Sequence, residues 1–508
     1  MALERKHAAL LLSTFLIAAC GIVYELLAGT VSSYLLGDSI TQFSLVIGLF
    51  MASMGLGAFL ARYVSSEPAQ GFIWLQVTVA LIGGSSALSL FFAFAYLGNT
   101  LPVLVAITIG VGAAVGAEIP FLIALLRTYR PLAANVSDVL TIDYLGALVA
   151  SLLFPLVIVP GLGLIRASAF FGLLNLFVAA MAAFLYWSRL RTRRRMVVAV
   201  AIAAGGLAGL FGGAERLAAE INARLYGGEI VLAETTPYQK LVLTRENGLL
   251  RFFINGGLQF DSRDEYRYHE SLVHPVMSLA RRRRHVLILG GGDGLALREV
   301  LKHRDVETVT LVDLDPAVTS LFRRNDLLAR MNGRAFESDR VRVVNEDAAR
   351  YLARGQDLYD IAIIDLPDPH DLTLSRLYSR WFYGLLRARL TADGVFVTQA
   401  TSPYYAREAF WTIAHTVEAA PGVYPLQAIP YHAYVPSFGD WGFVLAGSLD
   451  LDRRALVVSV PTRYLDAAQW EKMRHFASDL EELETPVNTL QTHTLARAYE
   501  LGWSRWYR

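Results

Sequence analysis

Cysteine and charge are both scarce in this sequence, and each shortage excludes a class of protein. Cys20 is the only cysteine among 508 residues, so a disulfide within the chain and a cysteine-based zinc site are excluded. Charged residues make up 18% of the chain, and the formal net charge is +1. This balance gives no sign of a polyanionic partner, so we expect no nucleic acid to bind.

Apolar residues are abundant instead, and they are concentrated in the first part of the chain. The sequence is 54% hydrophobic with a mean hydropathy of +0.40, which is too apolar for an ordinary soluble enzyme. We predict a helical transmembrane domain over residues 1–213, lying in a lipid bilayer. Six stretches in it are each long enough to cross roughly 30 Å of hydrocarbon: 8–30, 40–61, 72–97, 101–126, 140–160 and 164–187.

A seventh apolar stretch, 196–213, is shorter and rich in glycine. The basic residues around the spans all fall on one side of the membrane if the amino terminus is cytoplasmic. With that orientation, a spanning 196–213 places the rest of the chain outside the cytoplasm. An interfacial or re-entrant segment keeps it inside. The sequence does not decide whether the domain has six or seven spans.

Three acids lie in or near the apolar stretches: Glu25, Glu118 and Asp143. A carboxylate at membrane depth costs at least about 2.5 kcal/mol, so it usually faces a cavity or a partner. One interpretation is a cation site within the membrane domain. The other is a hydrogen bond between helices, or a position closer to the interface.

The rest of the chain is predicted to be an α/β domain. Short alternating strands with turns at Asn247-Gly248 and Asn255-Gly256 indicate a small antiparallel β module within 214–280. Over 281–447, strands alternate with helical patterns, which predicts a doubly wound, Rossmann-like sheet of the methyltransferase type. Residues 448–508 are expected to form a helical tail without chemistry of its own. The predicted strands are 285–289, 307–312, 341–345, 360–364 and 394–398.

Ligands of such sheets lie at the carboxyl ends of the strands, and the first strand ends in a glycine loop. In "HVLILGGGDGLALREV", residues 285–300, the glycines Gly290, Gly292 and Gly294 let the backbone approach a ligand. A dinucleotide fingerprint would need glycine or alanine where Leu295 stands, which weakens a nicotinamide nucleotide interpretation. A tight turn without a ligand is the other interpretation of such a loop.

Acids follow the second and third strands. Asp313 stands where a carboxylate can accept hydrogen bonds from both ribose hydroxyls, and Asp347 could accept one from an adenine amino group. Each acid alone is also a common cap or turn former. Together with the glycine loop they predict an adenosine site. Because no lysine-bearing phosphate loop is nearby, we expect adenosine without a triphosphate, as in S-adenosyl sulfonium compounds.

The fourth strand ends in two carboxylates. In "YDIAIIDLPDPHD", Asp365 and Asp368 stand at the strand tip, and Pro367 and Pro369 stiffen the turn. Two carboxylates beside a sulfonium suit a cationic amine, because they can bind its ammonium group and one can take its proton. The alternative is a proline-rich turn with capping acids.

Several ordered motifs over 229–445 resemble the spermidine synthase (polyamine aminopropyltransferase) family. The run "DEYRYHE" followed by "GGGDG" separates this family from generic methyltransferases. The membrane half resembles a long bacterial form, in which a multi-span region precedes the synthase domain. The matching motifs are "GGLQFDSRDEYRYHE", "LILGGGDGLALREV", "LVDLDP", "EDAARYL", "YDIAIIDLPDP" and "LYSRWFY".

The resemblance implies a role for each matching residue. Asp368 is the general base, Asp365 orients the amine or the base, and Gln399 lines the site or has a structural role. Tyr268 and Asp293 seat the aminopropyl arm, while His269 contacts an amine or packs. Decarboxylated S-adenosylmethionine is implied as a co-substrate, with no permanently bound cofactor and no metal. The residues expected to hold it are Gln259, Gly290, Gly292, Asp293, Gly294, Asp313, Asp347 and Ala348.

Two departures from the soluble family put the acceptor amine in doubt more than the donor. The family's Asp-Ser-Ser/Thr-Asp-Pro is replaced by the segment 365–369, "DLPDP". Its Tyr-Pro-Ser/Thr-Gly is replaced by 435–439, "VPSFG", so the acceptor-side tyrosine is displaced or lost, although Tyr434 is adjacent.

The expected function is transfer of an aminopropyl group to putrescine or a related polyamine. One alternative is a polyamine transporter or channel whose synthase-like domain senses or feeds substrate. Another is an amine N-methyltransferase that uses the same adenosine site. Because the donor is made in the cytosol, we expect a multi-pass protein of the cell membrane with a cytoplasmic catalytic domain, so that 196–213 is not a simple span. A homodimer fits the family.

Overall fold

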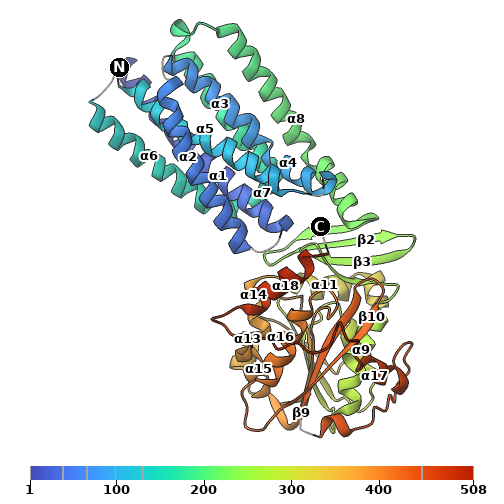
Figure 1. The fold of residues 1–508 in the computed structure, drawn as a ribbon. Coiled ribbons are helices and arrows are strands. Elements are labelled where there is room, and N and C mark those ends of the chain that lie inside the picture. The colour runs from blue at the N-terminus through green and yellow to red at the C-terminus, as the bar shows by residue number, and fades with distance from the viewer. Residues whose placement is uncertain are drawn as a thin grey trace. The chain divides into compact units, whose positions relative to one another are not determined.

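The chain folds into two compact units, Met1–Tyr226 and Gly227–Arg508. The computed structural model describes residues 2–36, 39–64, 67–97, 99–127, 131–447 and 450–506. Figure 1 shows the first unit in blue to green and the second in green to red. The sequence placed this boundary at residue 213. It lies at Tyr226 because the last apolar helix continues beyond the glycine-rich run.

The first unit is entirely helical where it is described. Within the described ranges, six segments are long and apolar enough to cross a membrane, by length and composition. The helices are α1 (Ala2–Leu36), α2 (Ser39–Val64), α3 (Pro68–Gly84), α4 (Ser86–Phe92), η1 (Ala93–Leu97), α5 (Leu101–Leu126), α6 (Leu132–Leu153), η2 (Phe154–Ile158), α7 (Val159–Leu185), η3 (Trp187–Arg189) and α8 (Arg193–Tyr226).

Two of the predicted spans, 140–160 and 164–187, belong to one helical run from Leu132 to Leu185. The run contains a π-helical turn, η2, and a break at Gly163, where φ is 70° and ψ is 170°. Glycine tolerates this conformation because it has no Cβ. The sequence pattern therefore located both apolar segments, and the structure joins them through a glycine.

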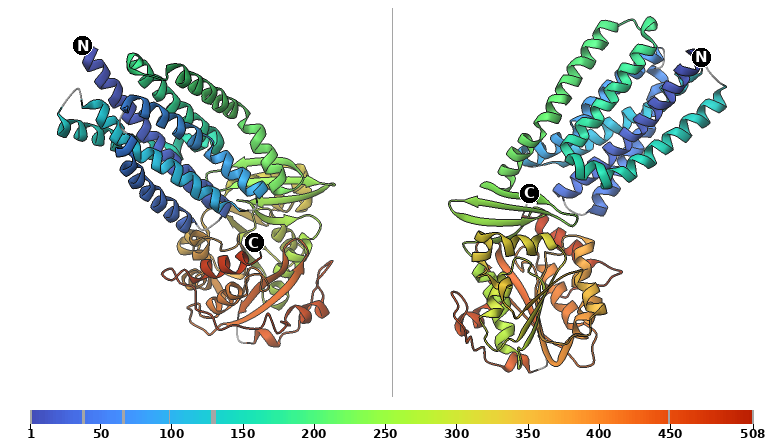
Figure 2. Two further views of the ribbon diagram at one scale, coloured as in Figure 1. Left: turned by 45° about the horizontal axis from the view of Figure 1, so that its top comes forward. Right: turned by 180° about the vertical axis from the view of Figure 1, so that it is seen from behind.

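The stretch 196–213 lies inside a helix of 34 residues, α8. Polar residues at both ends of the apolar stretch continue the helix, so the helix is longer than the stretch itself. Val197, Val198 and Ile202 on α8 are 49%, 55% and 71% exposed, as on a lipid-facing surface. Within this unit, the amino terminus and the turn between α7 and α8 lie at the same end of the helices (Figures 1 and 2).

Buried polar side chains link the helices of the first unit. Gln76 on α3 donates a hydrogen bond of 2.6 Å to the Glu118 carboxylate on α5, and both residues are buried. This contact is the interhelical hydrogen bond that was the alternative to a cation site at Glu118. Glu25 and Asp143 are half-buried. A cation site formed by these three acids stays a prediction.

Small residues let α2 and α5 approach each other closely. A Cβ added at Gly116 would lie 2.0 Å from the backbone oxygen of Met54, and one at Gly57 would lie 1.8 Å from that of Ala113. Such contacts are typical of helix pairs in membranes, because small residues allow backbones to pack together.

The second unit begins with an antiparallel sheet in the order β1-β2-β3-β4. Its turns at Asn247-Gly248 and Asn255-Gly256 have positive φ at both residues, as tight hairpin turns require. The predicted β module is confirmed. The strands are β1 (Glu229–Thr235), β2 (Lys240–Glu246), β3 (Leu249–Ile254) and β4 (Gly257–Asp261).

A seven-stranded sheet in the order β10-β11-β9-β8-β5-β6-β7 carries the rest of the unit. β9, β8, β5, β6 and β7 are parallel, while β11 and β10 are antiparallel to their neighbours. All five predicted strands are confirmed. The strands are β5 (His285–Gly290), β6 (Thr308–Asp313), β7 (Val341–Asn345), β8 (Tyr359–Asp365), β9 (Leu390–Gln399), β10 (Gln427–Val435) and β11 (Gly439–Gly447).

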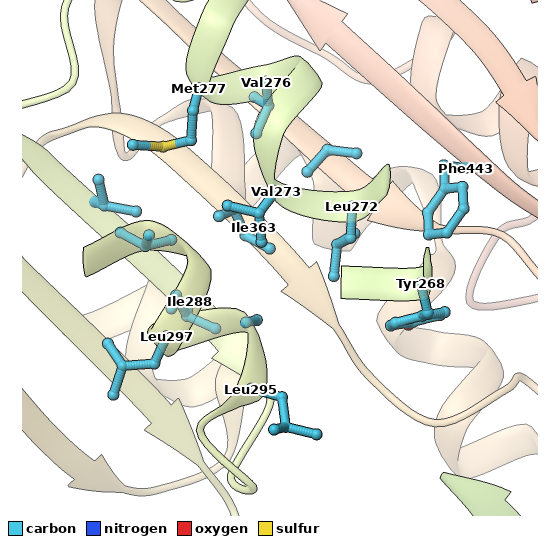
Figure 3. Close-up of a cluster of buried hydrophobic side chains, with 14 of the residues drawn as sticks. Tyr268, Leu272, Val273, Val276, Met277, Ile288, Leu295, Leu297, Ile363 and Phe443 are labelled. Carbon is cyan, nitrogen blue, oxygen red and sulfur yellow. The ribbon is translucent and has the colours of Figure 1, made fainter. Parts of the chain in front are cut away.

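Helices cover both faces of this sheet (Figure 2). Along β5 and β8, alternate residues enter two separate buried clusters, such as Ile288 and Ile363 on one face and Leu289 and Ile364 on the other. Figure 3 shows α9 side chains from Tyr268 to Met277 on the first face. The helices are α9 (Glu265–Leu279), α10 (Leu295–Leu301), α11 (Pro316–Arg324), α12 (Asp326–Met331), η4 (Ala335–Glu337), α13 (Ala348–Arg354), α14 (Leu372–Ser375), η5 (Arg376–Tyr378), α15 (Arg380–Arg387) and α16 (Arg407–Glu418).

The C-terminal segment differs from the predicted helical tail. It contains only η6 (Leu451–Arg453), α17 (Ala467–Met473) and α18 (Thr494–Ser504) among its described residues. The rest is irregular chain held to the domain by side chains. For example, buried Glu270 accepts hydrogen bonds from the backbone N–H groups of Arg463, Tyr464 and Leu465. Local sequence did not reveal these long-range contacts.

We predict that Gly116→Ala lowers the thermal midpoint of the detergent-solubilised protein. The new methyl group must displace the α2 backbone, and overpacking of this kind typically costs about 1–3 kcal/mol. Gly55→Ala is the matched control, because no atom lies within 4 Å of its added Cβ and alanine favours a helix. Equal midpoints for the two variants would contradict the close packing of α2 and α5.

Candidate active site

The glycine loop and the tip of β8 touch directly. Gly290 pairs with Asp365 across the parallel strands, and the N–H of Gly291 donates to the Asp365 backbone oxygen at 3.0 Å. Gly290 has a φ of +81°, and a Cβ there would lie 2.1 Å from that oxygen. Glycine is therefore required at this position, and the predicted donor loop is fixed against the predicted acceptor acids.

Asp313 at the end of β6 supports the same loop. Its Oδ2 accepts a hydrogen bond of 3.1 Å from the N–H of Gly292, and its Oδ1 accepts one of 2.9 Å from the N–H of Asp315. Burial raises the pKa of Asp313 to about 6. The next glycine, Gly294, caps the start of α10 with a left-handed φ of +76°.

Asp347 lies at the start of α13, and Ala348 is buried as the first residue of that helix. Asp347 accepts a hydrogen bond of 2.9 Å from the N–H of Arg350 and another from the Arg376 guanidinium. Burial alone would raise the pKa of Asp347, but these hydrogen bonds hold it below its ordinary value. Asp347 is therefore a helix cap, and its binding of adenine stays a prediction.

His269 carries a buried positive charge close to the acids. Its Nδ1 donates to the Glu265 carboxylate at 2.9 Å, and Arg298 donates to the same carboxylate at 2.9 and 3.0 Å. Burial lowers the pKa of His269, but the contact with Glu265 outweighs it and raises the pKa to about 9. The positive charge of His269 also interacts with Asp293 and Asp365, and its contact with an amine stays a prediction.

Asp293 and Asp365 are the two aspartates whose charges interact with this imidazolium. Asp293 accepts a hydrogen bond of 2.9 Å from the N–H of Leu295, and burial raises its pKa to about 6. The Tyr268 hydroxyl donates to Asp365 Oδ1 at 2.7 Å. Burial also raises the pKa of Asp365 above its ordinary value. Tyr268 lies at the end of the α9 cluster drawn in Figure 3.

Asp368 has three side-chain donors around its carboxylate. Gln399 donates to Oδ1 at 3.2 Å, Thr401 donates to Oδ2 at 3.1 Å, and the Tyr499 hydroxyl forms the third hydrogen bond. Burial nevertheless raises the pKa of Asp368 to about 6. The carboxylate is held in one orientation while its pKa stays close to neutral, as a general base requires.

Gln399 both lines the site and fixes its geometry. The side chain is 1% exposed. Its Nε2 donates to the Leu366 backbone oxygen at 2.9 Å and to the Tyr378 hydroxyl, and its Oε1 accepts from the N–H of Thr401 at 2.9 Å. These contacts tie the β8 tip to the end of β9.

Two other predicted positions lie away from these carboxylate contacts. Gln259 is half-buried on β4, and its Nε2 donates to the Gly257 backbone oxygen at 3.1 Å. Tyr434 is 58% exposed. The segment after it is held by Ser437, whose hydroxyl and N–H donate to Asp264 at 2.8 and 2.7 Å.

Several contacts in the site were not foreseen from the sequence. Tyr378 lies in the quoted motif "LYSRWFY", so its position was available but no role was assigned. Thr401 and Tyr499 carried no recognised pattern. Within the described residues, no group of three or more histidine, cysteine, aspartate or glutamate side chains could hold a metal ion.

Comparison with known proteins places this geometry in a family. Residues 265–450 match the spermine/spermidine synthase domain. The chain is 45% identical over 511 residues to polyamine aminopropyltransferase 2 of Ralstonia nicotianae, covering 99% of both chains. It is 40% identical over 501 residues to the polyamine aminopropyltransferase of Leptospira interrogans, covering 98% of this chain and 99% of the other. The chain belongs to the polyamine aminopropyltransferase family.

The membrane half is part of this similarity, because the alignments with both relatives span nearly the whole chain. A solved spermidine synthase from Thermotoga maritima is 24% identical, with a TM-score of 0.44, and covers 49% of this chain and 85% of the other. The family assignment favours aminopropyl transfer over methyl transfer.

We predict that Gly292→Ala weakens binding of methylthioadenosine at least tenfold. The added Cβ would lie 2.5 Å from Asp313 Oδ2, so the carboxylate expected to hold the ribose must move. A tenfold loss corresponds to about 1.4 kcal/mol. Isothermal titration calorimetry measures the affinity, and circular dichroism checks the fold. Unchanged affinity in a folded variant would remove Asp313 from the nucleoside site.

Proposed function

We propose that this enzyme transfers the aminopropyl group of decarboxylated S-adenosylmethionine to a primary amine of putrescine or a related polyamine. One observation carries the proposal. The half-buried carboxylates Asp365 and Asp368 stand at the β8 tip, and the Asp365 backbone lies directly beside the glycine loop. A cationic acceptor and a cationic donor can therefore be held next to each other.

The donor occupies the carboxyl ends of β5, β6 and β7 in this proposal. Asp313 accepts from the ribose, Asp347 and Ala348 contact the adenine, and Gly290, Gly292 and Gly294 allow close approach to the backbone. Asp293 and Tyr268 seat the aminopropyl arm, and Gln259 contacts the same end of the donor. Decarboxylated S-adenosylmethionine is a co-substrate, consumed in each turnover.

Asp368 acts as the general base on the acceptor. An amine with a pKa of about 10 is almost fully protonated at neutral pH and cannot attack carbon until it loses a proton. Asp368 removes one proton, and the nitrogen attacks the aminopropyl carbon next to the sulfonium. A C–N bond forms as the C–S bond breaks, and its electron pair leaves with sulfur as the neutral thioether methylthioadenosine.

The acids also lower the repulsion between the two substrates. Both are cations, so holding them in line is unfavourable unless negative groups lie between and around them. Asp293, Asp365 and Asp368 supply these charges. Tyr268 fixes the orientation of Asp365. The imidazolium of His269 limits the electrostatic repulsion among the carboxylates.

We predict that Asp368→Asn lowers kcat at least 100-fold, because general base catalysis typically contributes 10²–10⁴ in rate. Donor binding should change little. Mass spectrometry of reactions with decarboxylated S-adenosylmethionine and a panel of diamines measures methylthioadenosine and the aminopropylated amine. A wild-type kcat in Asp368→Asn would contradict the assignment of Asp368 as the base. S-adenosylmethionine in a parallel reaction tests methyl transfer.

The pH dependence follows from the raised pKa of Asp368. The base must be ionised, so kcat/KM should fall about tenfold per pH unit below the pKa of about 6. The corresponding decline in kcat should lie at lower pH, because two bound cations favour the carboxylate. A kcat/KM that stays constant down to pH 5 would argue against Asp368 as the base.

The membrane unit is proposed to lie in the cell membrane with the catalytic unit on the cytoplasmic side, where the donor is made. If α8 spans the bilayer, the turn before it and the catalytic unit lie on opposite sides. The basic residues before α8 favour the cytoplasmic side as well, so reporter fusions after residue 191 and at the C-terminus should both report the cytoplasm, with α8 not crossing the bilayer. A C-terminal reporter active only outside the cytoplasm would show that α8 spans and would contradict the cytoplasmic placement of the catalytic unit. Homodimer formation stays a prediction.

A further inference from the structure

The last helix of the chain, α18, packs against the catalytic domain through one face. Leu495, Ala498, Tyr499, Gly502 and Trp503 follow the spacing of a single helical stripe. Leu495 and Ala498 are 0% and 4% exposed. A Cβ at Gly502 would lie 2.6 Å from the Ala406 Cα, so the helix approaches the backbone after β9 very closely.

The chain segment that precedes α18 is held to the candidate site by a buried asparagine. Asn488 is 0% exposed, and its Nδ2 donates to the backbone oxygens of Ser375 at 2.9 Å and Tyr378 at 3.2 Å. Its backbone oxygen accepts from the N–H of Arg380 at 2.9 Å. Tyr378 also contacts Gln399, so the tail is attached to the elements that hold Asp368.

Two side chains of α18 contribute to the hydrogen bonds around the general base, one directly and one through Thr401. The Tyr499 hydroxyl hydrogen-bonds to the Asp368 carboxylate. Trp503 Nε1 donates to Thr401 Oγ1 at 3.4 Å, and Thr401 in turn donates to Asp368 Oδ2 at 3.1 Å. The tail is therefore part of the hydrogen-bonding environment of the base, both directly and through Thr401.

Aromatic rings connect this base to the second carboxylate. The Trp503 ring centroid lies 6.4 Å from that of Trp441, which lies 5.0 Å from that of Phe438. Phe438 lies 5.7 Å from Tyr268, whose hydroxyl donates to Asp365. We call Tyr268, Phe438, Trp441 and Trp503 the aromatic arc. It begins at Asp365 and ends beside Asp368.

Such an arc suits an alkylammonium ion. The faces of aromatic rings attract cations and pack against methylene groups, while the carboxylates at both ends favour the charged nitrogen. Where the soluble family carries its acceptor-side tyrosine, this chain has Val435, and the adjacent Tyr434 is exposed. A tyrosine hydroxyl nevertheless reaches Asp368, and it comes from α18.

We propose that α18 completes the acceptor site: Tyr499 is a positioning residue for Asp368, and Trp503 forms one wall of the amine pocket. The proposal rests on the proposed aminopropyl transfer and adds to it a role for the C-terminal tail. In this proposal the methylene chain of the acceptor amine lies along the aromatic arc.

Tyr499→Phe removes only the hydroxyl and tests the positioning role. The Asp368 carboxylate loses a donor, so its ionised form is less favoured. The acid limb of kcat/KM should move up by about 0.5–1 pH unit, which is a three- to tenfold loss below pH 6 and little loss at pH 8. Tyr434→Phe is the matched control and should follow the wild-type profile. A Tyr499→Phe profile that superimposes on the wild type overturns the positioning role.

Trp503→Leu tests the wall of the pocket, with Trp506→Leu, two residues beyond the end of α18, as the matched control. Trp506 is 51% exposed and contacts Tyr404 and Tyr405. The KM for putrescine should rise about 5- to 20-fold in Trp503→Leu, in the range expected for losing a cation–π contact. The KM for the donor should not change. An equal loss for donor and amine indicates general damage to the site and overturns the specific role.

Direct binding separates failure of this inference from failure of the proposed reaction. Calorimetry with putrescine and spermidine, in the presence of methylthioadenosine, needs no turnover. If the wild type forms no aminopropylated product, weaker amine binding in Trp503→Leu than in Trp506→Leu still supports the pocket. Equal amine affinity in the two variants overturns it, whether or not the enzyme is active.

Discussion

The hydrogen bond from the N–H of Gly291 to the Asp365 backbone oxygen joins the two halves of the active site. It exists because β5 and β8 are parallel neighbours whose register pairs Gly290 with Asp365. Since Gly290 has no side chain, the glycine loop comes into contact with the strand tip. The glycine loop and the β8 tip therefore cannot move apart without breaking the central sheet.

Electrostatics adds a second constraint. Burial raises the pKa to about 6 at Asp293, Asp313 and Asp368. Burial also raises the pKa of Asp365. One buried imidazolium, His269, offsets part of this negative charge, and it is itself kept protonated by Glu265. The clustered carboxylates therefore favour the binding of cations. Two cationic substrates satisfy the carboxylates better than water or the protein can, which favours binding them together.

Much of the fold was predictable from local patterns. The apolar stretches, the Asn-Gly hairpins and the five parallel strands each depend on a short window of sequence, so their positions were correct to within a few residues. Asp313, Asp365 and Asp368 were found for the same reason, because the carboxyl ends of parallel strands meet at one edge of a sheet. Gly290 and Gly292 were found by the strand-to-helix glycine pattern.

The sequence by itself therefore determined the classes of segment, the strands at whose ends the candidate site lies, and the acids proposed to act there. Tertiary structure decided the length of α8, the charge on His269 and the placement of Tyr499 and Trp503 beside the base. These features depend on contacts between residues far apart in the chain, such as Asn488 with Tyr378 and Trp503 with Thr401. Local periodicity shows that α18 has one buried face, but only packing selects the surface that this face covers.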